Sequence, residues 1–190
     1  MKKSKGIMFL EVVAVIAVGF LLISILVMQA VKAKQKTRDA QRKTSLSELR
    51  ASIESFANDY GHFPETYDAS DGEYKWFSYC NYQSEGWKAR GFGVWIPEIL
   101  EKGYVKLLPL DPLRKYFTGA MKNKVSDGGV SDSASFCYIY RSDGFDYKLA
   151  SYCGTEYDLA YPSQQFNKGL NNWSCGLYSY ALYSPGAYNW

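Results

Sequence analysis

One carboxylate, Glu11, stands inside an otherwise uncharged apolar run of 22 residues, Ile7 to Met28. Such a charge costs about 2.5–3.5 kcal/mol near the centre of a membrane-spanning helix, and less near its end, so intramembrane charges are rare and usually functional. A tolerated interfacial charge is the alternative. If the chain is cut after Gly6, the new ammonium group at Ile7 lies about one helical turn from Glu11. The amine of one copy can then pair with Glu11 of a neighbouring copy and set the axial register between copies.

The four cysteines all follow the apolar run, so they share one side of any membrane it spans. An even count after an export-type segment favours two disulfides in an oxidising compartment. A zinc ribbon is not expected, because none of the cysteines belongs to a C-x-x-C pair. Four cysteines allow three pairings, and the sequence does not choose among them. We favour Cys80–Cys137 with Cys153–Cys175, and free buried thiols are the alternative.

Other candidate chemistry is sparse. Asp127 and Asp132, in the segment DGGVSD, offer oxygen ligands to calcium. Their spacing does not fit an EF-hand, and Asp-Gly runs usually form turns, so we expect no cofactor, with calcium as the alternative. The single histidine, His62, lies just after the predicted helix, where a structural role is expected. Walker, G-x-S-x-G and H-E-x-x-H motifs do not occur, so we predict that the chain is not an enzyme.

A long N-terminal helix is predicted to carry Glu11. At about 1.5 Å per residue, the apolar run matches a hydrocarbon core of roughly 30 Å, and it exceeds the roughly 7–15 apolar residues of a cleaved secretory signal. Proline does not occur between Ile7 and Tyr60, and Gly61 supplies a stop signal. We therefore predict one helix, with or without a local break, from about Ile7 to about Tyr60.

The second half of this helix is amphipathic. Apolar residues recur in steps of three and four, which is the period of a helix with one buried face. They are Leu46, Leu49, Ile53, Phe56 and Tyr60. We expect this stripe to pack against a sheet.

Basic residues flank both ends of the apolar run, so the positive-inside rule does not decide its orientation. Lys2, Lys3 and Lys5 precede the run, and Lys32, Lys34, Lys36, Arg38, Arg42 and Lys43 follow it. The cysteines favour an N-terminus on the inner side. The basic block after the run is suited to contact anionic lipid headgroups.

The remainder of the chain predicts a small β-rich domain. Phe136–Arg141 and Phe145–Tyr152 are β-prone runs separated by Ser-Asp-Gly, which indicates a hairpin. Val94–Lys102 is predicted as a short helix that ends at Gly103. The expected fold class is α+β: a long N-terminal helix, transmembrane in its first half and amphipathic in its second, packed on a small antiparallel β-sheet with a loop-rich, disulfide-tied C-terminal region.

The N-terminus resembles the processing site of type IV pilins and of type II secretion pseudopilins. A basic leader, Gly6, an apolar first mature residue and a glutamate at the fifth mature position carry the resemblance. Ile7 stands where the family most often has Phe, and Met8-Phe9-Leu10 replaces the usual Thr-Leu-Ile. The resemblance implies that a prepilin peptidase/methyltransferase cuts between Gly6 and Ile7 and methylates the Ile7 amine. Glu11 would then be the assembly carboxylate.

The resemblance covers roughly the first third of the chain. The half-helix after the span has basic spacing of the RDAxR type and ends in a turn similar to the family's YxxxxGxYP pattern. Phe56, Tyr60, Gly61, Phe63 and Pro64 occupy the matching places. Further along, Asp111 between Pro109 and Pro112 resembles the turn that precedes the sheet in many pilins.

The family implies four parts: a leader (residues 1–6), a transmembrane or filament-core half-helix (7–31), an amphipathic half-helix (32–61) and a head domain (62–190). The implied function is a structural subunit of a type IV pilus-like filament, or fimbrium. Implied partners are further copies, the peptidase, an inner-membrane assembly platform, the membrane before assembly, and nucleic acid only in a DNA-uptake pilus. The precursor would lie in the inner membrane and the filament outside it, at the cell surface.

Two alternatives stay open. A pseudopilin of a type II secretion-like machine would share the processing and the helix. A membrane-tethered adhesin or carbohydrate-binding module would use the tyrosines and tryptophans of the last forty or so residues. A tethered module of that kind needs neither processing nor Glu11.

Overall fold

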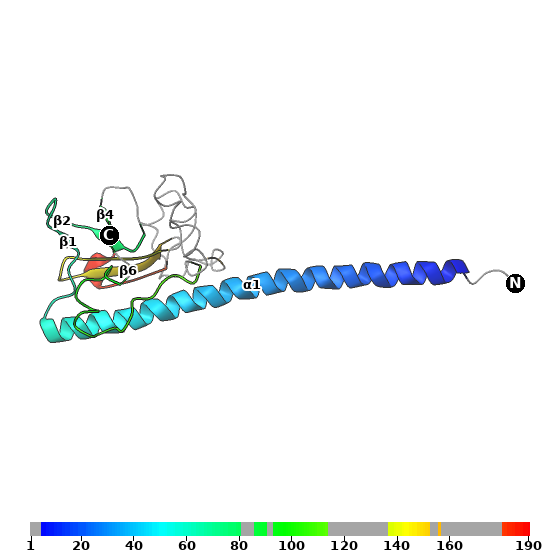
Figure 1. The fold of residues 1–190 in the computed structure, drawn as a ribbon, viewed down its shortest axis with the longest axis horizontal. Helices are drawn as coiled ribbons and strands as arrows, with labels where there is room; N and C mark the ends of the chain where they lie inside the picture. Colours follow the sequence, from blue (N-terminus) through cyan, green and yellow to red (C-terminus); the bar gives the residue numbers. More distant parts are fainter. Residues whose placement is uncertain (1–4, 81–85, 91–92, 114–136, 153–155, 157–179) are drawn as a thin grey trace. The chain divides into compact units, whose positions relative to one another are not determined.

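The computed structural model describes residues 5–80, 86–90, 93–113, 137–152, 156 and 180–190. Within the first helix, side chains are described at residue 9 and from residue 11 onward. The chain divides into two compact units, Met1–Thr37 and Arg38–Trp190. The fold is α+β, as predicted: a long N-terminal helix whose second half packs on a sheet (Figure 1).

The helix α1 extends from Lys5 to Tyr60 without interruption. It therefore begins two residues before the predicted start and ends at the predicted residue. Gly61 follows with φ 79°, and its N–H donates to the carbonyl of Ala57 at 2.9 Å. A left-handed glycine just after the last turn is a common way to end a helix, because it costs little and satisfies a terminal carbonyl.

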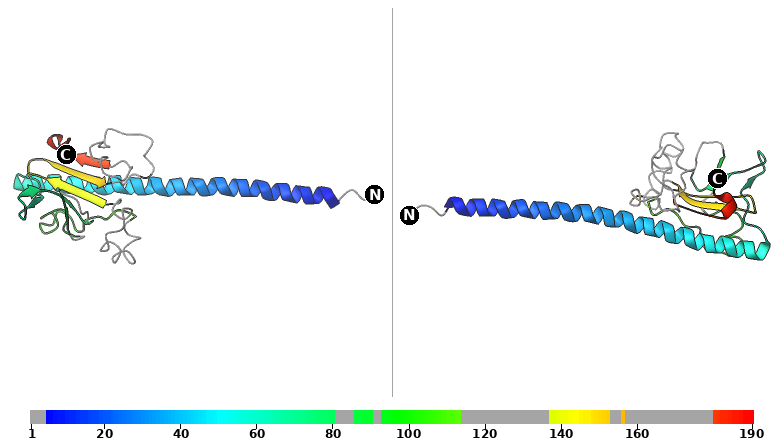
Figure 2. Two further views of the ribbon diagram at one scale, coloured as in Figure 1. Left: turned by 90° about the horizontal axis from the view of Figure 1, so that it is seen from above. Right: turned by 180° about the vertical axis from the view of Figure 1, so that it is seen from behind.

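Two sheets follow α1. β1 (Tyr67–Asp68) and β2 (Glu73–Tyr74) form a short antiparallel pair. The larger sheet has the strand order β4-β3-β5-β6-β7. Its strands are β3 (Trp76–Ser78), β4 (Trp87–Ala89), β5 (Cys137–Ser142), β6 (Tyr147–Tyr152) and β7 (Tyr180–Tyr183), and the 3-10 helix η5 (Pro185–Ala187) follows β7. Figure 2 shows β5, β6 and β7 side by side.

The pairing in this sheet is antiparallel except at one edge, where β3 and β4 run parallel. The predicted hairpin is confirmed as β5 and β6, with Cys137 opposite Tyr152 and Ser142 opposite Tyr147. At the turn, the carboxylate of Asp143 accepts the N–H groups of Phe145 at 2.9 Å and Asp146 at 2.8 Å. Gly144 supplies the φ of 90° that this turn requires.

The predicted stripe of α1 forms the core, apart from its last member. Leu46, Leu49, Ile53 and Phe56 are buried, and the first three share one cluster with sheet residues such as Tyr138 and Leu149. Tyr60 was expected in the stripe, but 44% of it is exposed. As the last residue of the helix, it stacks on the ring of Phe56 at 4.5 Å between centroids instead of entering the core.

The predicted helix at Val94–Lys102 is wrong. Residues 97–103 form hydrogen-bonded turns, in which Ile99 N–H donates to the Pro97 carbonyl and Lys102 N–H to the Glu98 carbonyl. Glu98 has φ 60°, and a left-handed residue at this point prevents a continuous right-handed helix. The apolar side chains of Ile96 and Ile99 nonetheless reach the core.

The predicted disulfide Cys80–Cys137 is confirmed, with 6.2 Å between the two Cα atoms. It joins the segment after β3 to the first residue of β5, a neighbouring strand. Cys153 and Cys175, the other predicted pair, lie outside the described residues.

Replacing both Cys80 and Cys137 with serine is expected to lower the free energy of unfolding of the head by about 4 kcal/mol. The reason is that the bond closes a loop with a sequence separation of 57 residues. Urea unfolding of the full chain in detergent micelles, followed by tyrosine and tryptophan fluorescence, measures this. Ser55→Ala, on the exposed face of α1, is the control and should stay within about 0.5 kcal/mol. An unchanged midpoint in the double variant would contradict the prediction.

Candidate functional site

The first half of α1 presents apolar side chains on all sides. Exposed members are Phe9, Val12, Val13, Val15, Ile16, Val18, Phe20, Leu21, Leu22, Ile23, Ile25, Leu26, Val27, Met28 and Val31. The helix is long and apolar enough to cross a membrane, and none of its most apolar window is buried within the chain. Membrane anchors and signal sequences both have these features. In the described part of the chain this apolar surface is uncovered, and an exposed apolar surface of this size is typical of a contact with a membrane or with another protein.

Glu11 is the only acidic residue between Met1 and Arg38, and its side chain is exposed on α1. The structure places the Gly6–Ile7 peptide bond inside the first turns of the same helix. Positions four apart lie on one face of a helix, so the backbone nitrogen of Ile7 and the side chain of Glu11 are separated by about one turn. The three residues singled out by the sequence are thus gathered at one end of the apolar surface.

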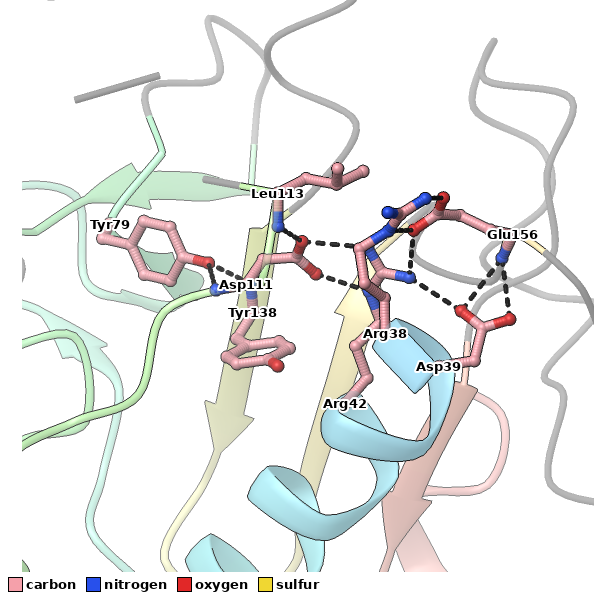
Figure 3. A network of polar contacts seen from close by, with 8 residues as sticks. All are labelled: Arg38, Asp39, Arg42, Tyr79, Asp111, Leu113, Tyr138 and Glu156. Atoms are coloured by element: carbon pink, nitrogen blue, oxygen red, sulfur yellow. Dashed lines mark hydrogen bonds and ion pairs between the residues drawn. The ribbon is translucent and has the colours of Figure 1, made fainter. Parts of the chain in front are cut away.

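A second constellation lies in the head, where buried charged groups surround Arg42 (Figure 3). The guanidinium of Arg42 donates from Nε to Oδ2 of Asp111 at 2.7 Å and from Nη2 to Oδ1 at 2.9 Å. The side chains of the two residues are 1% and 0% exposed. This two-pronged geometry matches the planar guanidinium fork to a carboxylate, and it is the strongest form of the pair.

The third nitrogen of Arg42 joins two further acids. Nη1 donates to Asp39 at 2.7 Å and to Glu156 at 2.8 Å. Arg38 forms a second bidentate pair, with Glu156, in which Nε donates to Oε1 at 2.7 Å and Nη2 donates to Oε2. The backbone N–H of Glu156 points back at both carboxylate oxygens of Asp39, each at 3.0 Å. We call these five residues, Arg38, Asp39, Arg42, Asp111 and Glu156, the charge cluster.

Backbone groups and a tyrosine complete the hydrogen bonding of Asp111. Its carboxylate also accepts the N–H of Leu113 at 2.9 Å, within the turn after Pro109. The hydroxyl of Tyr79 accepts the N–H of Asp111 at 3.0 Å and that of Tyr138, on β5, at 3.3 Å. The charge cluster therefore ties α1 to the segment around Asp111, which Tyr79 ties in turn to the sheet.

Hydrogen bonds within the charge cluster favour the charged forms of Arg42 and Glu156. Burial opposes the charge on Arg42, but hydrogen bonds to Asp111 and Glu156 outweigh it and raise the pKa of Arg42. Burial likewise opposes the charge on Glu156, yet hydrogen bonds from Arg38 and Arg42 leave its pKa below the ordinary value. The cluster holds two basic and three acidic side chains. Neither the raised pKa of Arg42 nor the lowered pKa of Glu156 moves towards neutral pH. The arrangement suits holding the head together rather than acid–base catalysis.

The sequence predictions missed this cluster. Arg38 and Arg42 had been grouped with the lysines as one basic block suited to contact lipid headgroups, which is wrong for these two residues, because both bind acidic side chains of the head. Asp39 and Arg42 continue the three-and-four spacing of Leu46 and Leu49 towards the N-terminus. Charged residues in phase with a buried stripe were the available signal.

The calcium candidates Asp127 and Asp132 lie outside the described residues. Within the described part of the chain, groups of three or more His, Cys, Asp or Glu suited to a metal ion do not occur. His62 has its Nδ1 atom 3.0 Å from the carbonyl oxygen of Phe63 and meets the Phe56 ring edge-on.

No protein-family model, curated protein or solved structure matches this chain. The resemblance of its N-terminus to prepilins therefore rests on the residues of the processing motif.

Replacing Arg42 with alanine is expected to lower the free energy of unfolding by about 3–5 kcal/mol, because it removes the cation that Asp111 binds in a buried place and leaves Glu156 with Arg38 alone. The matched control is Arg50→Ala on the same helix. Arg50 pairs with Glu54 at 2.7 Å, but both side chains are more than 40% exposed, so the loss should stay below about 1 kcal/mol. Urea unfolding of both variants in micelles measures the difference. Equal losses would show that the charge cluster adds no more than a surface pair.

Proposed function

We propose that this chain is a structural subunit of a type IV pilus-like filament, cut between Gly6 and Ile7 and assembled through the first half of α1. The observation that carries the proposal is an uncovered apolar helix with one carboxylate, Glu11, a helical turn from the residue that would become the N-terminus. The Cys80–Cys137 disulfide supports the placement of the head in an oxidising compartment.

In this proposal the apolar surface of α1 is covered first by a lipid bilayer and then by neighbouring copies in the filament. Burying a Val, Leu, Ile or Phe side chain contributes about 1.5–3 kcal/mol, so the exposed residues from Phe9 to Val31 strongly favour a cover. A lipid bilayer covers them in the precursor, and neighbouring copies of the same helix cover them in a filament. Contacts between apolar helices alone would allow many axial positions, since one aliphatic side chain packs much like another.

Glu11 restricts those positions. An unpaired carboxylate in an apolar helix bundle is costly, and pairing with an ammonium group offsets much of that cost. Cleavage before Ile7 creates the only such ammonium at the same depth. A copy that slides along its neighbour by one turn leaves both charges unpaired, so the pair selects one register. In this proposal, processing and assembly are coupled, because the partner of Glu11 exists only after cleavage.

Gly6 makes the Gly6–Ile7 peptide bond easier for a peptidase to reach. The Gly6–Ile7 peptide lies in the helical part of the chain, and a peptidase acts on an extended substrate. Glycine weakens a helix by about 1 kcal/mol relative to alanine, so the end of α1 opens at low cost at this residue. The basic residues Lys2, Lys3 and Lys5 belong to the leader, so the proposed cleavage removes them together with Gly6.

Mass spectrometry of the protein purified from its native cells is expected to show a chain that starts at Ile7 with a methyl group on its amine. This is the mass expected from prepilin-type processing, which combines cleavage after Gly6 with methylation of the new amine. An intact Met1, or a start beyond Met28, would exclude the proposed assembly and favour a tethered or secreted binding module.

Replacing Glu11 with alanine is expected to abolish surface filaments, or to reduce them at least about tenfold, while the protein stays in the membrane fraction. The physical reason is the loss of the charge that selects the register. Immunogold counting of filaments on whole cells and membrane fractionation give the two readouts. The matched control is Glu48→Ala, an exposed acid on the second half of α1, which should leave filaments normal. Normal filaments in the Glu11 variant would remove the assembly role of this residue.

A further inference from the structure

The basic residues after the apolar run fall into two structural groups. Arg38 and Arg42 turn towards the head and are neutralised by Asp39, Asp111 and Glu156. Lys32 and Lys34, one to two turns earlier on α1, are exposed. The structure thus separates residues that look like one continuous basic block in the sequence.

The charge of these lysines is not balanced locally along the chain. After Glu11, the next acidic residue is Asp39, and it belongs to the charge cluster. Lys32 and Lys34 therefore lie on a stretch of the sequence that has no acidic residue between Glu11 and Asp39.

The positions of the lysines match the depth of lipid headgroups. The run from Ile7 to Met28 is about 33 Å long as a helix, close to the roughly 30 Å of a hydrocarbon core. Lys32 follows Met28 by about 6 Å and Lys34 by about 9 Å. The headgroup layer adds roughly 5–7 Å on each side, and a lysine side chain can extend several ångströms along the helix to reach it.

The directions of the two lysines favour a lipid surface over a protein partner. Residues two apart on a helix differ by about 200° around its axis, so Lys32 and Lys34 point to opposite sides. A protein docking on one face of α1 would meet one of them. A leaflet surrounds a membrane-spanning helix and meets both.

We propose that Lys32 and Lys34 form a lysine collar that binds the anionic phospholipid headgroups of the leaflet on the side of the head, and so holds the span at a fixed depth before assembly. The proposal rests on the membrane-embedded precursor stage of the proposed function. Lysine suits this contact because a compact ammonium on a flexible stem follows mobile phosphates, whereas the arginines of the charge cluster meet fixed carboxylates in a planar fork.

The test uses the full chain in phosphatidylcholine bilayers that contain a trace of spin-labelled phosphatidylglycerol or phosphatidylcholine. Electron spin resonance gives the fraction of each lipid held at the protein surface. The preference for phosphatidylglycerol is expected to fall about twofold or more in Lys32→Gln/Lys34→Gln. In the wild type, 1 M salt should produce a fall at least as large, because the screening length shortens to about 3 Å for the leader lysines as well. The leader lysines are unchanged in both chains, so their contribution cancels.

The matched control, Lys102→Gln/Lys106→Gln, removes the same charge from exposed positions in the head and should keep the wild-type preference. A collar variant with the wild-type preference, or a control variant that loses as much, would overturn the lysine collar. Carbonate washing of the same bilayers separates the two proposals. If the wild-type chain washes out, the membrane stage of the proposed function fails, and the collar with it. If the wild-type chain stays in the bilayer but Lys32→Gln/Lys34→Gln has the same preference for phosphatidylglycerol, only the lysine collar is contradicted.

Discussion

The two-pronged pair between Arg42 and Asp111 is the constraint on which the head depends. It is buried, and it joins positions 69 residues apart. Because a buried charge without its partner is far more costly than the pair is favourable, the pair penalises every arrangement in which α1 and the Asp111 turn do not meet. The pair therefore adds little net stability, but it selects the one arrangement in which α1 and the Asp111 turn are in contact. The apolar stripe beside it supplies most of the stabilising contact, and the charges decide where along the helix that contact begins.

The same helix thus meets two kinds of surroundings with two kinds of side chain. From Phe9 to Val31 its exposed large side chains are apolar, and Glu11 is the one acidic residue of this stretch. From Asp39 onward one face carries a specific sequence of charged and apolar groups that fits one sheet. Apolar side chains can pack against many partners, whereas the charged and apolar face fits one arrangement of the head.

Much of the fold follows from local signals that the sequence displays. The end of α1 at Gly61, the stripe from Leu46 to Phe56 and the hairpin around Gly144 each depend on residues close together in the chain, where glycine and periodicity act directly. The Cys80–Cys137 bond was favoured among three pairings, without a local reason to choose it. The turns at 97–103 were mistaken for a helix, because the backbone of Glu98 is set by packing of its neighbours rather than by its own preference.

The charge cluster and the parallel pairing of β3 with β4 were beyond local inference for a different reason. Both join segments whose approach is a property of the whole domain. Asp111 and Glu156 carry nothing in their immediate sequence that names Arg42 as a partner. Only the phase of Asp39 and Arg42 with Leu46 hinted that charges enter the core. The candidate site at Gly6, Ile7 and Glu11 could be predicted for the opposite reason, since all three residues lie within six consecutive positions of one helix.

The sequence separations in the head also bear on the timing of folding. α1 is made first, yet the partners of its buried face arrive late: Arg42 waits for Asp111, Arg38 waits for Glu156 118 residues later, and β6 receives its outer neighbour β7 only at Tyr180. Contacts between such distant segments form slowly, because a long loop must close first. A chain that still lacks these later segments therefore has an amphipathic helix without its complete sheet. The head can complete its packing only once β7 has been made and has paired with β6.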